Sequence, residues 1–213
     1  MKTTILSVAC LLTTATSAIA AVPINGWYMG GFGGYTYLFN NINKTYLGLT
    51  RDTARYDAGY NAGARVGYQS NPLRYEGELT FIHADLNQFR INNAPQFGVS
   101  GNTEATLGMA NVYYDFPEMV PAVAPFVGVG LGYGVVSGQL KSKGPLYTYY
   151  DVDNTAFAFQ FTAGLTYNFS EYGSANLAYR YIGTDNVDKL GKMFQASVAS
   201  LGIVYRFNEK LYK

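Results

Sequence analysis

His83 is the only histidine of the chain, and it is the first residue to consider as a catalytic base. It stands in FIHADL, two residues before Asp85. Nucleophilic catalysis needs a serine or cysteine beside such a base, and a third group that orients it. No serine lies near His83, and the only cysteine is Cys10, close to the start of the chain. One histidine is also too few for a zinc ligand set. The sequence therefore predicts no catalytic residue, no metal, no cofactor and no enzymatic activity.

Charged residues alternate with large apolar residues in several short stretches. In LRYEGEL, residues 73–79, the charged positions are Arg74, Glu76 and Glu78, and Arg206 is flanked by aromatics in VYRF. A period of two indicates strands whose two faces meet different surroundings. If the charged faces point inward they must be paired. We expect an interior cluster of Arg65, Glu76, Glu78 and Arg180, with Arg74, Asp115 and Arg206 nearer one rim. The cluster is either structural or a gate in an ion path.

Eight stretches show this alternation and are expected to be strands: 26–39, 57–70, 73–86, 103–116, 125–138, 154–169, 174–183 and 194–207. One face of each is large and apolar, and the other is small, polar or charged. A soluble sandwich that buried the large faces would turn glycine-rich faces to water. A transmembrane barrel needs the reverse, with apolar residues facing lipid and the sheet closed on itself. We predict an all-β fold, an eight-stranded antiparallel up-and-down transmembrane β-barrel.

Aromatic residues make up 16% of the chain, and many stand toward the ends of the apolar faces. Such residues form girdles at the two interfaces of a membrane barrel. The girdle candidates are Trp27, Tyr35, Tyr37, Tyr60, Tyr68, Tyr75, Tyr114, Phe116, Tyr167, Phe169, Tyr179, Tyr181, Tyr205 and Phe207.

The connections between strands alternate in length. Long connections at 40–56, 87–102, 139–153 and 184–193 alternate with short ones at 71–72, 117–124 and 170–173. In bacterial barrels the short turns are periplasmic and the long loops extracellular, so an even number of strands places both strand termini in the periplasm. The loops are rich in Asn, Tyr and Arg, and Tyr and Arg are favoured in interfaces. Their partner is either a host surface protein or, for the basic residues, anionic lipopolysaccharide.

Composition and the first residues indicate export. Residues 1–20 carry one lysine, a short apolar run and a small-residue end, which predicts a signal peptide cleaved after Ala20. A lipoprotein signal at Cys10 is the weaker alternative, because the apolar region before it is too short. Cleavage after Ala20 would leave residues 21–213 to form the barrel. Because Cys10 is the only cysteine, this mature chain would have no disulfides. The net charge of +1 excludes a broad electrostatic surface for nucleic acid.

The segments GWYMGGFGGY, NLAYRYIG and LGIVYRF resemble small eight-stranded outer-membrane barrels of Gram-negative bacteria. This class includes the OmpA membrane domain, OmpX and the opacity or surface-antigen "porin family". The resemblance implies an outer-membrane location and a monomeric surface antigen, envelope-stabilising protein or adhesin with four extracellular loops. Family members usually end on the aromatic of the last strand, whereas here NEKLYK follows Phe207, and we expect this tail, residues 208–213, in the periplasm.

Two alternatives stay open within this resemblance. The first is a narrow channel, because Gly128, Gly130, Gly132 and Gly134 would leave the lumen short of side chains and able to hold water. The second is modification of lipid A. The deacylases that this barrel resembles carry His and Ser two residues apart on one strand, and here Asp85 occupies the second position.

Overall fold

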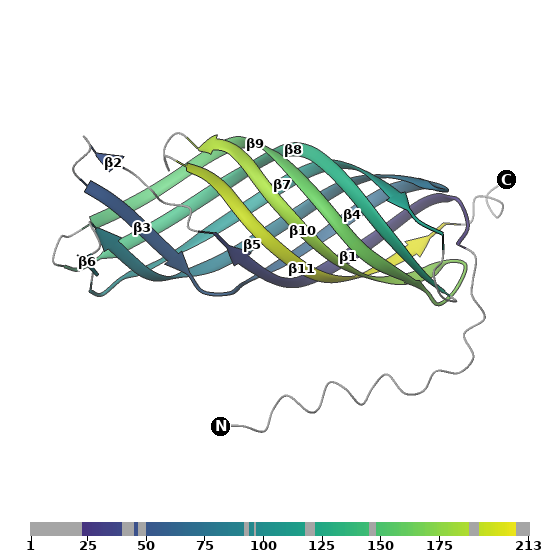
Figure 1. Cartoon of the computed structure of the whole chain (residues 1–213), viewed down its shortest axis with the longest axis horizontal. Helices are drawn as coiled ribbons and strands as arrows, with labels where there is room; N and C mark the ends of the chain where they lie inside the picture. Colours follow the sequence, from purple (N-terminus) through teal and green to yellow (C-terminus); the bar gives the residue numbers. More distant parts are fainter. Residues whose placement is uncertain are drawn as a thin grey trace, which may run out of the picture.

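Eight long antiparallel strands close into a barrel in the computed structural model (Figure 1). The structure describes residues 23–39, 45–46, 50–91, 94–95, 97–117, 122–144, 148–187 and 192–207. The barrel strands are β1 (Gly26–Leu38), β4 (Gly59–Ser70), β5 (Leu73–Ile91), β7 (Ser100–Asp115), β8 (Val123–Ser142), β9 (Thr148–Asn168), β10 (Gly173–Val187) and β11 (Lys192–Arg206). Neighbours in sequence pair with each other, and the β1–β11 pairing closes the sheet. The predicted fold class is confirmed.

None of the described residues belongs to a helix long and apolar enough to cross a membrane. The predicted signal peptide, its cleavage site at Ala20 and the tail 208–213 lie outside the described residues.

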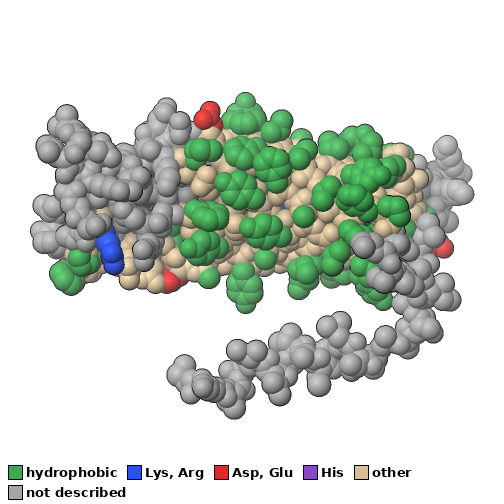
Figure 2. Space-filling view, viewed as in Figure 1, with side chains coloured by type: hydrophobic (Ala, Val, Ile, Leu, Met, Phe, Trp, Pro, Cys, Tyr) green, Lys and Arg blue, Asp and Glu red, His purple; other side chains and the backbone are tan. Residues whose placement is uncertain are grey.

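The two faces of each strand are divided as the alternation predicts. On β11, Ile203 is 67% exposed on the outer surface, whereas Arg206 is 4% exposed inside the barrel. Figure 2 shows hydrophobic side chains over the visible barrel wall, with the visible charged side chains of the described residues toward its two ends. The apolar exterior is the face that lipid would solvate, and the polar groups pack in the lumen.

The two ends of the barrel differ. At the terminal end, where β1 begins and β11 ends, the strands are joined by short turns, including the cis Asn71–Pro72 bond. At the opposite end, here called the loop end, the strands are longer than predicted. β5 continues to Ile91, and β8 pairs with β9 as far as Ser142 and Thr148. The expected loop 40–56 also contains β3 (Thr50–Tyr56), which pairs with β5, and β2 (Thr45–Tyr46). The short β6 (Ala94–Pro95) adds to β5 as well.

The sequence prediction ended these strands too early because it followed the apolar face. Beyond the membrane-facing band that face becomes polar, as at the exposed Asp85 and Asn87 of β5. The backbone ladder does not depend on lipid and continues into this region.

The loop half of the lumen is filled by a packed apolar cluster. Its residues come from all the barrel strands except β4: Leu38, Ile82, Ala84, Ala105, Leu107, Met109, Val136, Ala156, Ala158, Ile182, Phe194, Ala196 and Val198. Each of these side chains is less than a tenth exposed. The sequence predicted a lumen lined by polar and small residues, and this apolar half is a departure from it. Eight strands leave an interior that side chains can fill, so the charged residues need occupy only part of it.

The glycines that face the lumen do not leave it empty. A Cβ atom at Gly128 would lie 2.1 Å from Cδ1 of Tyr113, and one at Gly134 would lie 2.9 Å from Cδ2 of Leu107. Large side chains from neighbouring strands therefore occupy the space opposite these glycines. The expectation of a water-holding gap along β8 is wrong at these positions, because a glycine on one strand makes room for a large residue on the next.

We expect Gly63→Ala to destabilise the barrel by about 1–3 kcal/mol, as overpacking of a filled core does. Its Cβ would lie 2.3 Å from Cζ of Phe32 and 2.5 Å from the carbonyl oxygen of Leu79. Gly77→Ala on the outer surface is the matched control, since its Cβ would meet only the Val66 oxygen at 3.9 Å. Urea unfolding in phospholipid vesicles, followed by the fluorescence of the single tryptophan Trp27, measures both variants. Equal stability of the two variants would contradict the filled lumen.

Candidate functional site

The terminal half of the lumen holds a network of buried charged residues. Strand register brings Arg65 of β4 opposite Glu78 of β5, and Gly67 opposite Glu76. Arg180 of β10 and Arg206 of β11 approach from the other side of the barrel. All the predicted interior charges point into the lumen, and all but Asp115 are at most 5% exposed. The alternation of each strand is sufficient to turn these residues inward.

Ion pairs link most of these residues. Arg74 lies 2.8 Å from Oε1 of Glu76 and 3.2 Å from Oδ1 of Asp115. Arg65 lies 3.8 Å from the other oxygen of Glu76, and Arg180 lies 3.8 Å from Glu78. Arg74 was expected with the rim residues, but it bridges Asp115 at the rim and Glu76 in the deeper cluster. The deeper charged residues and those at the rim of the barrel therefore form one connected network.

Aromatic rings lie against three of the lumen guanidinium groups. Phe32 lies beneath Arg180, with the guanidinium carbon 4.0 Å from the ring centroid, and Arg65 lies 5.5 Å from the same ring. Arg74 lies against both Tyr113 and Phe126, with its guanidinium carbon 4.6 and 4.8 Å from the two ring centroids. A cation over an aromatic face is stabilised by the ring quadrupole, more so when water is excluded. These rings were not predicted as site residues, although their inward register could have identified them.

Arg206 is bound differently from the other three lumen arginines. Its Nε donates to Gln69 Oε1 at 3.0 Å, and its terminal nitrogens donate to Ser174 at 3.2 Å and to Asn168 at 3.4 Å. Among the described residues no carboxylate lies within 4.0 Å of it. Gln69 connects it to Asp115, since Gln69 Nε2 donates to Asp115 Oδ2 at 3.3 Å.

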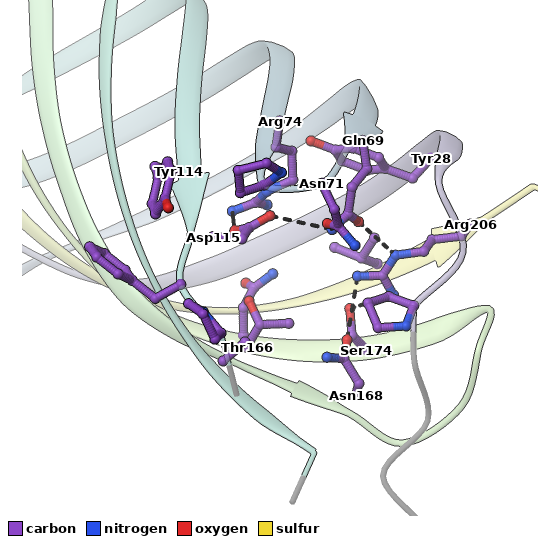
Figure 3. Close-up of a pocket in the computed structure, with 17 residues that line it drawn as sticks. Tyr28, Gln69, Asn71, Arg74, Tyr114, Asp115, Thr166, Asn168, Ser174 and Arg206 are labelled. Carbon is purple, nitrogen blue, oxygen red and sulfur yellow. Dashed lines mark hydrogen bonds and ion pairs between the residues drawn. The ribbon is translucent and has the colours of Figure 1, made fainter. Parts of the chain in front are cut away.

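A cavity of about 320 Å³ opens beside Arg206 at the terminal end of the barrel (Figure 3). Figure 3 shows Arg206, Gln69 and Ser174 on one side of it, and Arg74 with Asp115 on the other. Apolar residues of the turns, among them Pro72 and Phe116, also line it. The cavity was not predicted, because it depends on how the turns close around the rim.

His83 lies on the outer surface near the loop end, not in the lumen. Its Nδ1 is 3.1 Å from Glu104 Oε1, its Nε2 is 3.4 Å from Asp85 Oδ1, and Tyr60 stacks on its ring at 5.1 Å. Both ring nitrogens therefore face carboxylates. Within the described part of the chain, no group of three or more His, Cys, Asp or Glu residues is arranged to hold a metal ion.

The sequence matches a known protein family with this architecture. The family model for the outer membrane protein beta-barrel domain matches residues 6–207. The chain belongs to this outer-membrane β-barrel family.

Relatives and solved structures agree with the family. An outer membrane protein of Gluconacetobacter diazotrophicus is 30% identical over an alignment of 197 residues, and the match covers 81% of this chain and 50% of that protein. The chain thus spans about half the length of this relative. An uncharacterized protein of Brucella suis biovar 1 is 26% identical over an alignment of 204 residues, and the match covers 78% of this chain and 70% of that protein.

Two solved structures share the fold at lower identity. Neisserial surface protein A has a TM-score of 0.58 at 17% identity and covers 85% of this chain and 97% of its own. OprG from Pseudomonas aeruginosa has a TM-score of 0.53 at 11% identity and covers 87% and 98%. The family and these relatives place the protein in the bacterial outer membrane. In such barrels the short turns and strand termini face the periplasm, so the terminal end is the periplasmic end.

The predicted girdle residues all lie on the outer surface of this outer-membrane barrel. Near the periplasmic end they form edge-to-face pairs: Trp27 with Tyr68 at 5.5 Å, Tyr114 with Phe116 at 5.0 Å, and Tyr205 with Phe207 at 5.5 Å. Tyr75, Tyr167 and Phe169 are also exposed near this end, and Tyr35, Tyr37, Tyr60, Tyr179 and Tyr181 lie toward the loop end or the middle of the wall. Their depth in a bilayer stays a prediction.

The Arg180–Glu78 ion pair can be tested by removing its two members one at a time and together. We expect Arg180→Met and Glu78→Gln each to destabilise the barrel by about 3 kcal/mol, because each leaves one polar partner buried and unpaired. The double variant should be less destabilised than the sum by about 1 kcal/mol or more.

Arg180→Met combined with Asp115→Asn is the matched control, because these two residues share no partner in the network. The control pair should be additive within about 0.5 kcal/mol. Urea unfolding in vesicles measures all variants, and additivity of the Arg180–Glu78 pair would show that the two residues do not interact.

Proposed function

We propose that the protein is a non-enzymatic surface protein of the outer membrane. In this proposal the barrel acts as a monomeric, filled anchor that stabilises the envelope. Its four extracellular loops and the strand extensions beneath them act as a surface antigen or adhesin. The observation that carries the proposal is the apolar cluster in the loop half of the lumen, because a filled lumen directs function to the parts that project from it.

The strand extensions at the loop end support the same function. β3 pairs with β5, and β8 and β9 remain paired well beyond the apolar wall, so part of the extracellular region is a continuous sheet. Phe97 is 72% exposed there, and Lys141 lies 5.3 Å from the exposed ring of Tyr149. Aromatic residues are enriched at protein interfaces. Lys141 and the neighbouring Lys143 are exposed as well, and they are placed to meet anionic lipopolysaccharide or a host surface protein.

We expect that trimming the β8–β9 extension removes adhesion without affecting the barrel. In the variant, residues 140–150 are replaced by Asn-Gly, which closes the hairpin above the Gln139–Asp151 pair. The trimmed barrel should keep its heat-modifiable gel mobility. Adherence of the displaying Gram-negative cells to cultured epithelial cells should fall several-fold.

A second variant tests whether adherence depends on the side chains of this extension or only on its length. It replaces the same residues by a Gly/Ser segment of equal length, and it should lose adherence as the trimmed variant does. Cells displaying the wild-type protein that adhere no better than cells without it would contradict the adhesin role. Antibodies raised against the folded protein test the antigen role on intact cells.

The narrow channel is the alternative function, and the apolar cluster argues against it. Ions passing the charge network would meet a region lined by Leu107, Ile182 and Phe194, each at most 1% exposed. Apolar constrictions close pores by excluding water. The periplasmic cavity alone does not make a path.

We therefore expect the folded protein to give no discrete conductance steps in a planar bilayer. The Arg65→Ala/Arg180→Ala variant should also be silent, because the apolar cluster lies beyond the charges it removes. Leu107→Ser/Phe194→Ser, which places hydroxyl groups in the cluster, should conduct if it folds, as checked by gel mobility. Steps in the wild type that grow in the Arg65→Ala/Arg180→Ala variant would overturn this expectation and support a gated channel.

Modification of lipid A has little support from the described residues. His83 lies among Glu104, Asp85 and Tyr60, and none of these side chains is the hydroxyl nucleophile that a serine-type deacylase needs. We propose that His83 is a polar residue of the outer interface.

A further inference from the structure

We propose that the cavity at the periplasmic end binds a small organic carboxylate that enters from the periplasm. The site is separate from the extracellular region and does not rest on the adhesin proposal. Arg206 lies at one side of it, and its lining comes from the ends of all eight barrel strands and from the short turns (Figure 3).

The charges of the lumen leave one cation without a counter-charge. Four arginines face three carboxylates in the described part of the network. Arg206 is the one whose described partners are all neutral. A guanidinium has five N–H donors, and three are used here, so two remain for a further acceptor. A buried cation is costly unless it is paired, and a carboxylate in the cavity would supply the missing charge.

Other polar atoms of the residues that line the cavity lack hydrogen-bond partners among the described residues. Asn176 is 3% exposed, and its Oδ1 accepts from Arg65 at 2.8 Å, while its Nδ2 has no hydrogen-bond partner among the described residues. The Nε of Arg74, another lining residue, also has no hydrogen-bond partner among the described residues. Both groups are donors. Buried polar groups are usually satisfied, so spare donors in the residues around the cavity favour a ligand that accepts hydrogen bonds over one that donates them.

The rest of the lining sets the size and shape of the ligand. A volume of about 320 Å³ is at the lower limit of small-molecule sites. Pro23, Pro72, Phe116 and Val204 give the cavity apolar walls. A carboxylate attached to a small apolar body fits this combination better than a bare inorganic ion, which would leave those walls without contacts.

Benzoate and its uncharged analogue benzyl alcohol are suitable probes. Isotope-labelled mature protein in phospholipid nanodiscs is titrated with each, and backbone amide shifts are followed by NMR. We expect saturable shifts at cavity residues with benzoate, with a dissociation constant in the millimolar range, and at least tenfold weaker binding of benzyl alcohol. Inorganic phosphate is titrated in parallel, and phosphate binding as tight as benzoate would overturn the carboxylate assignment.

Two sets of variants test the role of charge. Arg206→Gln should weaken benzoate binding at least tenfold, because the charge-assisted contact is lost. If Arg206→Gln does not fold, Ala124→Glu tests the same point, since Ala124 lines the cavity beside Thr166 and would bring a negative charge to Arg206. Ala124→Gln is its matched control and should bind benzoate far better than Ala124→Glu. Absence of saturable shifts in the wild type, or equal binding by Ala124→Glu and Ala124→Gln, would overturn the proposal.

Discussion

The closed backbone ladder is the constraint on which the rest of the structure depends. Within a bilayer no water is available to the peptide groups, so each strand must pair on both sides, and the β1–β11 and β5–β7 pairings complete the ring. Closure also decides which face of each strand is inside. Lipid takes the large apolar outer faces, and the faces left for the lumen carry glycine, polar and charged side chains toward the periplasmic end and a packed apolar cluster toward the loop end. Arg206 is buried between exposed Tyr205 and half-buried Phe207 for this reason.

A narrow ring then requires the inward side chains to satisfy one another. In the periplasmic half the charged residues form ion pairs with one another. Glu76 pairs with both Arg65 and Arg74, and aromatic rings lie against guanidinium groups. The extracellular half has fewer charges to pair, because much of its interior is the apolar cluster, and inward polar residues there such as Asn61 and Thr36 are hydrogen-bonded to each other. Glycines make this packing possible: Gly202 leaves room for the Arg65 guanidinium and the Asn176 amide, each 2.6 Å from the position that a Cβ would take. Small residues on one strand and large residues on the next therefore form one packed interior.

Much of this structure could be predicted from the alternation alone, since the period of two is local to each strand. The fold class, the inward charges and the outward aromatics follow from it. The partners of those charges do not, because they depend on the register between strands and on the stagger of the closed ring. Arg74 illustrates the limit: its position near the rim was predictable, but its bridge between Glu76 and Asp115 was not. The polar β3 shows a second limit, because an extracellular strand has no lipid-facing pattern to identify it.

The two ends of the lumen differ in what they leave unsatisfied. Toward the loops the side chains of the apolar cluster are buried against each other, and apolar side chains need no hydrogen-bond or charge partner. Toward the periplasm, the described network has four arginines and three carboxylates, and Arg206, whose described partners are all neutral, lies beside one cavity. Neutral acceptors such as Gln69 and Ser174 fix the position of a guanidinium but do not cancel its charge. The Arg206 charge beside an open cavity is therefore left for an anion that enters from the periplasm, and the proposed carboxylate site depends on this charge and not on the extracellular loops.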